Sequence, residues 1–153
     1  MKTIKQMNLG SQGLVIPTIG LGCMGMSKMN GAGVYGKADD KESIATIHRS
    51  FDLGGNFLDT ADIFGLGENE RLVAKAVSGN RDKYIIATKF GVEIDNDGNR
   101  TGRINGTKSY MRKAIERSLR NLNTDYIDLY YLHRLDINTP VEETVAAMAE
   151  LVE

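Results

Sequence analysis

The stretch that decides the fold is "NFLDTADIFG", residues 56–65, in which a short apolar strand ends on an acid before the chain turns. Phe57 and Asp59 lie on one face of that strand, because alternate residues of a strand point to the same side. Two other segments have the same design: "YIIATK" ends on Lys89, and "YIDLYYLH" ends on His133. The sequence therefore predicts three strands that each close on a polar side chain.

Helices are predicted around these strands. Asp39 and Glu42 are spaced as in a capping box, and apolar residues at helical spacing follow them. Near the end of the chain, Thr139 is expected to cap a helix that has Pro140 in its first turn. The expected helices cover residues 39–53, 68–77, 109–122 and a stretch from residue 140 onward. The third is expected to bury a stripe of Met111, Ile115, Leu119 and Leu122.

The start of the chain adds two features. Residues 1–17 predict a β-hairpin with glycines in its turn, and residues 18–22 predict one more strand. Strand and helix then alternate four times, with crossovers long enough for parallel pairing, so the predicted fold class is α/β with a parallel sheet. The last helical pattern runs to residue 153 without a glycine, asparagine or proline stop, which indicates a chain cut in or just after that helix.

Length, charge balance and cysteine content indicate which kinds of binding partner and compartment to expect. The 153 residues suffice for one domain, and 19 Lys and Arg residues nearly balance 20 Asp and Glu residues. Neither nucleic acid nor an anionic membrane surface is therefore an expected partner. The single cysteine, Cys23, cannot form an internal disulfide, and no stretch approaches the roughly 20 apolar residues of a membrane span. We expect a cytoplasmic protein.

Two motifs resemble ligand-binding sequences, but the residues around them do not fit a binding site. "GLGCMG", residues 20–25, matches a dinucleotide fingerprint, but no helix is predicted to begin at it. The fingerprint also needs an acidic residue roughly 20 residues further on, whereas Asp59, which ends the next predicted strand, lies about twice that far away. The D-x-D at residues 95–97 lacks the other ligands of a calcium loop. It fits a solvated turn in a long loop over residues 90–106. No metal site is expected.

The polar strand ends form the candidate site. The carboxyl ends of successive parallel strands meet at one edge of a sheet or one mouth of a barrel, so Asp59, Lys89 and His133 are expected to converge. Taken singly, each residue has a purely structural explanation. Asp59 could cap a turn, Lys89 could be a solvated strand end, and His133 could be a hydrogen-bonded core histidine. Together they favour a functional site, because three unpaired polar groups buried at matched positions would be costly.

Four blocks carry a family resemblance: "GLGCMGMS", "NFLDTADIFGLGENERLVAKAV", "IIATKFG" and "DLYYLHR". In order and spacing they closely resemble the aldo-keto reductases, and the resemblance covers essentially all 153 residues. It implies the N-terminal half of a (β/α)8 TIM barrel. Residues 1–17 would form the hairpin that closes the barrel bottom, and residues 18–153 would supply about four βα units.

The resemblance also implies a function, the NADPH-dependent reduction of a small aldehyde or ketone. By position, Asp59 pairs with Lys89, and His133 orients or polarises the carbonyl. Gly22, Cys23 and Met24, together with Asp59, are expected to contact the cofactor. Lys89 keeps its charge most readily beside an acid, so the implied pairing agrees with elementary electrostatics.

One residue departs from the family pattern. The tyrosine that donates the proton falls on Phe64 here, and a phenyl ring has no proton to give. Catalysis by the usual mechanism is therefore expected to be impaired. Tyr35, on the same rim loop as Cys23, is the substitute that the sequence suggests, whereas Tyr131 points inward but deeper than His133. Natural loss of the hydroxyl and its deliberate removal are equally consistent with the sequence.

Length is the second departure, because a full barrel needs about 250 residues and eight strands. The family's later loops, which hold the pyrophosphate and the 2′-phosphate, have no counterpart, so the choice between NADP and NAD stays open. A second copy of the chain is a possible cover for the two open sheet edges. A non-catalytic half-barrel interaction module and an inactive fragment are the alternatives to an impaired reductase.

Overall fold

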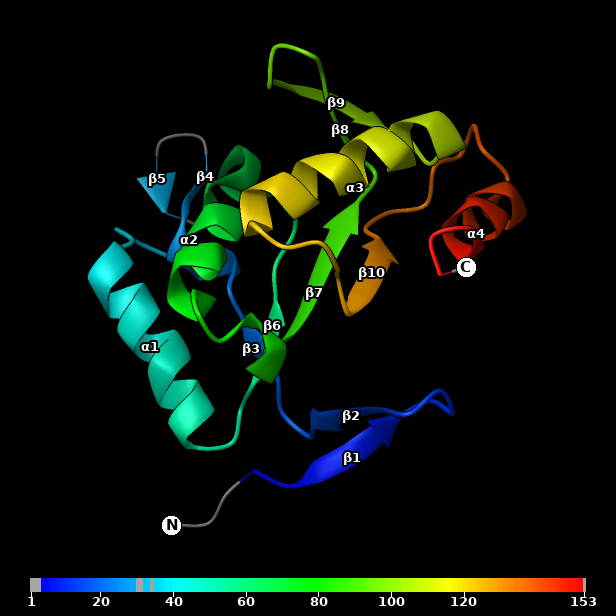
Figure 1. Ribbon diagram of the computed structural model, residues 1–153. Coiled ribbons are helices and arrows are strands. Elements are labelled where there is room, and N and C mark those ends of the chain that lie inside the picture. The colour runs from blue at the N-terminus through cyan, green and yellow to red at the C-terminus, as the bar shows by residue number, and fades with distance from the viewer. Residues whose placement is uncertain (1–3, 30–31, 34, 153) are drawn as a thin grey trace.

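The computed structural model describes residues 4–29, 32–33 and 35–152. Its centre is a four-stranded sheet in which every neighbouring pair is parallel and the strands lie side by side in chain order (Figure 1). The predicted α/β fold with a parallel sheet is confirmed. The strands are β3 (Leu21–Gly22), β6 (Phe57–Asp59), β7 (Ile85–Phe90) and β10 (Leu129–Leu132).

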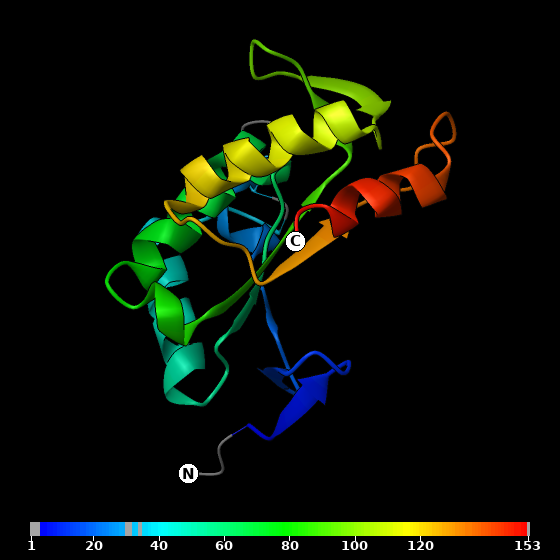
Figure 2. The same cartoon turned by 45° about the vertical axis from the view of Figure 1, so that its right-hand side comes forward.

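The helices form a row in the same order. Helix α1 contacts α2, α2 contacts α3, and α3 contacts α4, and Figure 2 shows α4 beside β10. Successive strands each followed by a helix, with the helices side by side, are the arrangement of half a (β/α)8 barrel. The helices are α1 (Asp40–Asp52), α2 (Glu68–Val77), α3 (Lys108–Leu122) and α4 (Val141–Ala149).

Side-chain capping explains where two of the helices begin. Asp39 accepts the backbone N–H of Glu42 at 2.9 Å, as predicted, and Thr107 caps α3 in the same way. The cap predicted at Thr139 is wrong. Its hydroxyl donates to the Asp136 carboxylate at 2.8 Å instead, and Pro140 occupies the N-cap position. Helix α4 ends at Ala149 rather than continuing with its apolar pattern.

The predicted N-terminal hairpin is present, and it lies at the end of the sheet where the strands begin (Figure 1). Its strands are β1 (Gln6–Leu9) and β2 (Leu14–Pro17), paired antiparallel. The turn between them needs glycine, since Gly10 and Gly13 both have positive φ. The Gln6 side chain donates to the Gly54 carbonyl at 3.2 Å, which joins the hairpin to the end of α1.

Residues 90–106 differ from the long loop that was expected. They form a further antiparallel hairpin, β8 (Val92–Ile94) with β9 (Arg100–Ile104), around the predicted turn. The strands exist because Val92 and Ile94 are buried against Phe64 and its neighbours. The remaining short elements are β4 (Lys28–Met29), β5 (Ala32–Gly33) and the 3₁₀ turns η1 (Met24–Met26), η2 (Phe64–Gly67) and η3 (Arg81–Lys83).

The main core lies between the sheet and the row of helices. Leu58 and Ile86 of the strands are fully buried against Ile47 of α1 and Val73 of α2. Burial of each such side chain stabilises the fold by about 1.5–3 kcal/mol. Helix α3 is rotated from the predicted stripe, so Ile115 and Leu119 are only half-buried. The residues it buries are Tyr110, Met111, Ala114, Ser118 and Leu122.

Candidate active site

The structure brings Asp59 and Lys89 together as predicted. Lys89 lies on β7 one strand away from Asp59, and its Nζ donates to Asp59 Oδ1 at 2.5 Å and to the Thr60 carbonyl at 2.7 Å. The lysine side chain is 16% exposed and the aspartate side chain 38% exposed. The pair therefore stands at the edge of solvent, where a small molecule can reach the carboxylate.

Phe64 closes one side of this pair. The backbone of Gly65, Leu66 and Gly67 is left-handed, with φ of 58°, 53° and 87°, which reverses the chain directly after Phe64. The phenyl ring is 7% exposed, and its centroid lies 5.4 Å from Lys89 Nζ. At this distance the ammonium is attracted to the ring, but the ring supplies neither a hydrogen bond nor a proton.

His133 completes the predicted cluster. It follows directly after β10, where its backbone N–H donates to the Phe90 carbonyl at 2.7 Å. Its imidazole packs edge-on against Phe64, with ring centroids 5.9 Å apart. Burial, reinforced by the positive charge of Lys89, lowers the pKa of His133 below its usual value. The imidazole is therefore neutral at neutral pH and can hydrogen-bond a neutral ligand.

The glycine-rich loop after β3 lies against the same pair. Gly22 stands opposite Asp59 in the sheet, and the backbone N–H of Cys23 donates to the Asp59 carbonyl at 2.8 Å. Apart from its two chain neighbours, no described residue has a heavy atom within 4 Å of where a Cβ on Gly22 would be, so a ligand can approach the backbone there. The Cys23 thiol is fully buried, and burial raises its pKa to about 12. Met24 packs against the buried apolar cluster that contains Phe64.

A residue that sequence reasoning missed holds this loop in place. Asn69 of α2 is fully buried, and its Nδ2 donates to the Cys23 carbonyl at 2.7 Å and to Ser27 Oγ at 3.0 Å. Its Oδ1 accepts from Thr60 Oγ1 at 2.7 Å. One amide thus joins the loop to the segment that follows Asp59. A polar residue in the first turn of a helix gave no sign of burial in the sequence.

A second buried network supports the segment that carries Phe64. Asp62 is 1% exposed, and Arg117 Nη2 of α3 donates to its Oδ2 at 3.0 Å. The fully buried Glu70 accepts from Thr88 Oγ1 at 2.8 Å and from Asn121 Nδ2 at 2.9 Å. Burial, with a further contribution from the negative charge of Glu70, raises the pKa of Asp62 to about 7.

This shift predicts how stability depends on pH. Between about pH 4 and pH 7 the folded chain keeps a proton on Asp62 that the unfolded chain has released, so stability falls as pH rises. Compared with Asp62→Asn, the native chain should lose about 1.4 kcal/mol per pH unit in this window. Urea unfolding at several pH values measures the free energy of unfolding of both proteins. The difference between the two free energies removes the contributions of the other titrating groups. A difference that stays constant from pH 5 to 7 would contradict the shift.

Tyr35 was the expected substitute for the missing hydroxyl, but the tyrosine that the structure brings to the Asp59–Lys89 pair is Tyr131. Tyr131 pairs with Lys89 in the sheet, and its ring centroid lies 6.0 Å from Lys89 Nζ. Burial and the charge of Asp59 raise the pKa of the Tyr131 phenol. Tyr35 is 79% exposed and packs near Gly25 instead.

The described residues show neither a metal-binding cluster nor a membrane-spanning helix. Among them no group of three or more histidine, cysteine, aspartate or glutamate side chains is placed to hold a metal ion. No helix in the described ranges is both long and apolar enough to cross a membrane.

Comparison with known proteins gives one consistent family. The sequence pattern of the Aldo/keto reductase family matches residues 18–153. A probable aldo-keto reductase of Glycine max is 41% identical over 152 residues, which are 98% of this chain and 42% of that protein. The family resemblance seen in the sequence is therefore confirmed.

Solved structures agree with the sequence matches. The holo form of an aldo-keto reductase from Bacillus halodurans has a TM-score of 0.82 at 36% identity, over 97% of this chain and 46% of that one. An aldo-keto reductase of Klebsiella pneumoniae in complex with NADPH has a TM-score of 0.75 at 32% identity, over 98% and 46%. The chain spans less than half the length of each of these relatives. It belongs to the aldo/keto reductase family of oxidoreductases.

Proposed function

We propose that this chain supplies the Asp59–Lys89–His133 side of a site for NADPH-dependent reduction of a small aldehyde or ketone. The observation that carries the proposal is the hydrogen-bonded pair of Asp59 and Lys89, with His133 on the far side of position 64. The Klebsiella pneumoniae relative whose structure contains NADPH supports the choice of cofactor.

Each side chain has a task that its surroundings allow. Asp59 holds the Lys89 side chain in place by a hydrogen bond, and a neutral His133 can donate a hydrogen bond to a carbonyl oxygen. NADPH, when bound, supplies the hydride. The missing part is a proton donor at position 64, because the Phe64 ring occupies the place beside Lys89 from which a proton would come. We therefore infer weak turnover.

The residues present fit the nicotinamide end of the cofactor. The open face of Gly22 and the exposed oxygen of Asp59 leave room for a ring to lie over the end of β3 and β6. Met24 borders the same place. The buried thiol of Cys23 leaves only its backbone for such a contact.

The test is a titration of the purified chain with NADPH, followed by aldehyde reduction with and without Lys89→Met. We expect saturable binding, slow turnover, and loss of that turnover in the variant. Lys83→Met is the matched control, since Lys83 lies before β7 at the other end of the strand and its ammonium donates to Asn80 Oδ1 at 2.6 Å. Turnover that survives Lys89→Met would refute the role assigned to Lys89.

A second candidate is a non-catalytic interaction module, which Phe64 favours because it removes the proton donor. The sheet offers a surface for it, since β3 and β10 each have a single neighbour. We propose that a second copy of the chain covers these edges, in keeping with a cytoplasmic protein. Sedimentation distinguishes the cases: a dimer is expected, and a monodisperse monomer excludes this mode of assembly.

A further inference from the structure

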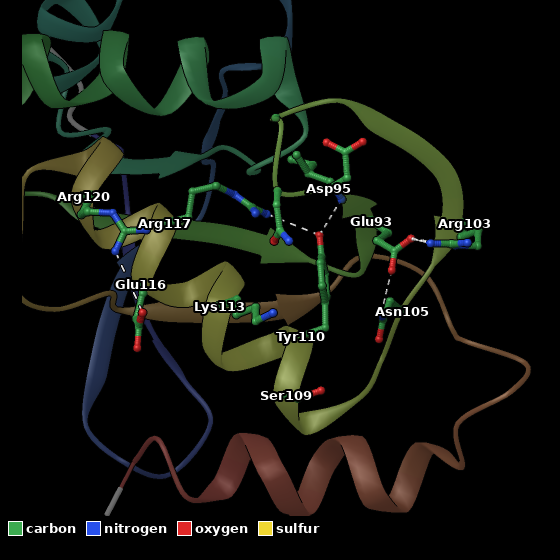
Figure 3. A pocket seen from close by; sticks show the side chains of 13 residues that line it. Glu93, Asp95, Arg103, Asn105, Ser109, Tyr110, Lys113, Glu116, Arg117 and Arg120 are labelled. Atoms are coloured by element: carbon green, nitrogen blue, oxygen red, sulfur yellow. Dashed lines mark hydrogen bonds and ion pairs between the residues drawn. The ribbon is translucent and has the colours of Figure 1, made fainter.

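We propose that the cavity between α3 and the β8–β9 hairpin is a binding site for a small organic anion that carries phosphate or carboxylate groups. The cavity measures about 560 Å³, within the usual range of small-molecule sites (Figure 3). Asp59, Lys89 and His133 do not line it. The inference is therefore independent of the proposed reductase function.

The helix wall of the cavity is cationic. Lys113, Arg117 and Arg120 follow one another at spacings of four and three residues, which places them on one face of α3, and all three line the cavity. Within the described part of the chain, the Lys113 ammonium has no hydrogen bond or ion pair. Arg120 meets Glu116 only at 4.0 Å, and both side chains are mostly exposed. This wall therefore has hydrogen-bond donors that are available to a ligand.

The hairpin wall, by contrast, uses most of its acceptors internally. Glu93 accepts from Asn105 at 2.9 Å and from Thr101 and Arg103 at 2.7 Å each. These bonds lower the pKa of Glu93 to about 2, so its charge is permanently matched by Arg103. On the adjoining turn, one oxygen of Asp95 already accepts two backbone N–H groups.

Arg117 forms the floor between the two walls. Its Nη2 is held by Asp62 at 3.0 Å and by the Tyr110 hydroxyl at 3.4 Å, and its side chain is 25% exposed. Its Nε is buried without a protein partner in the described structure. The raised pKa of Asp62 leaves this guanidinium only partly neutralised near neutral pH. An anchored guanidinium beside the Lys113 ammonium suits an oxyanion, to which both cations can donate charge-assisted hydrogen bonds.

The test is titration of the isotope-labelled chain with inorganic phosphate and, separately, with citrate, at an ionic strength held constant with chloride. We expect saturable amide shifts confined to the hairpin and the first three turns of α3. The two probes distinguish a preference for phosphate from one for carboxylates. Lys113→Gln should weaken binding at least about fivefold, which is the effect of removing one charged hydrogen bond at a partly exposed site.

Arg112→Gln is the matched control, because it removes the same charge from the same helix but from a side chain that bonds Glu150. It should change the affinity by less than about twofold. Two results would overturn the proposal. One is the absence of saturable shifts with both probes in a chain whose amide spectrum is dispersed. The other is equal weakening by the two variants, which would indicate diffuse charge attraction rather than a site.

Discussion

Phe64→Tyr is expected to raise the rate of NADPH-dependent carbonyl reduction by about 10²- to 10⁴-fold, the usual contribution of a positioned general acid. The ring at position 64 already lies 5.4 Å from Lys89 Nζ and packs edge-on against His133. A hydroxyl added to it enters the field of the Lys89 ammonium, which Asp59 holds in place by a hydrogen bond. That positive charge stabilises the phenolate left behind when the proton is donated.

The measurement is kcat/KM for a simple aldehyde across pH, in the native chain and in the variant. A new apparent pKa should accompany the gain in the variant, since the added phenol titrates and a phenyl ring does not. Adding Lys89→Met to Phe64→Tyr is the control and should abolish most of the gain. If NADPH binds equally well to both proteins while their rates are the same, position 64 does not supply the missing proton.

Asn69→Ala is expected to have the largest effect on stability, a loss of about 3 kcal/mol or more. The substitution removes three buried hydrogen bonds and leaves the Cys23 carbonyl and the hydroxyls of Thr60 and Ser27 without that partner. Each buried polar group left unsatisfied costs about 1–3 kcal/mol. Urea unfolding at neutral pH provides the measurement.

Asn96→Ala is the natural comparison, because Asn96 lies in the exposed turn of the β8–β9 hairpin and has no such bonds in the described structure. It should change stability by less than about 0.5 kcal/mol. A loss below about 1 kcal/mol for Asn69→Ala would show that water replaces the amide at little cost. In that case the loop after β3 is held by its contact with Asp59 alone.

The candidate site was predictable because it depends on where strands end. Asp59, Lys89 and His133 were each recognisable as a polar residue that closes an apolar run, and parallel pairing brings such ends together without further information. The hairpin at residues 6–17 was equally clear, since its glycines mark a turn that other residues adopt only with strain.

The features that the sequence did not reveal depend on tertiary contacts. The pairing of β8 with β9 exists because Val92 and Ile94 find a buried surface beside Phe64, and a three-residue strand is too short to show an alternating pattern of its own. Asn69 has a polar side chain, and yet the fold buries it completely. Thr139 had the right sequence context for a cap, but the nearby Asp136 carboxylate competes for its hydroxyl.

The order of the strands has a consequence for how the chain acquires its shape. Each strand of the main sheet pairs with the one that precedes it in the chain, so no strand has to wait for a distant segment. Each parallel pairing still has to close a crossover that contains a helix, so the sheet is expected to form more slowly than the helices themselves. During synthesis, β6 can add to β3, β7 to β6 and β10 to β7 as each leaves the ribosome, so that one exposed edge always belongs to β3 and the other to the newest strand.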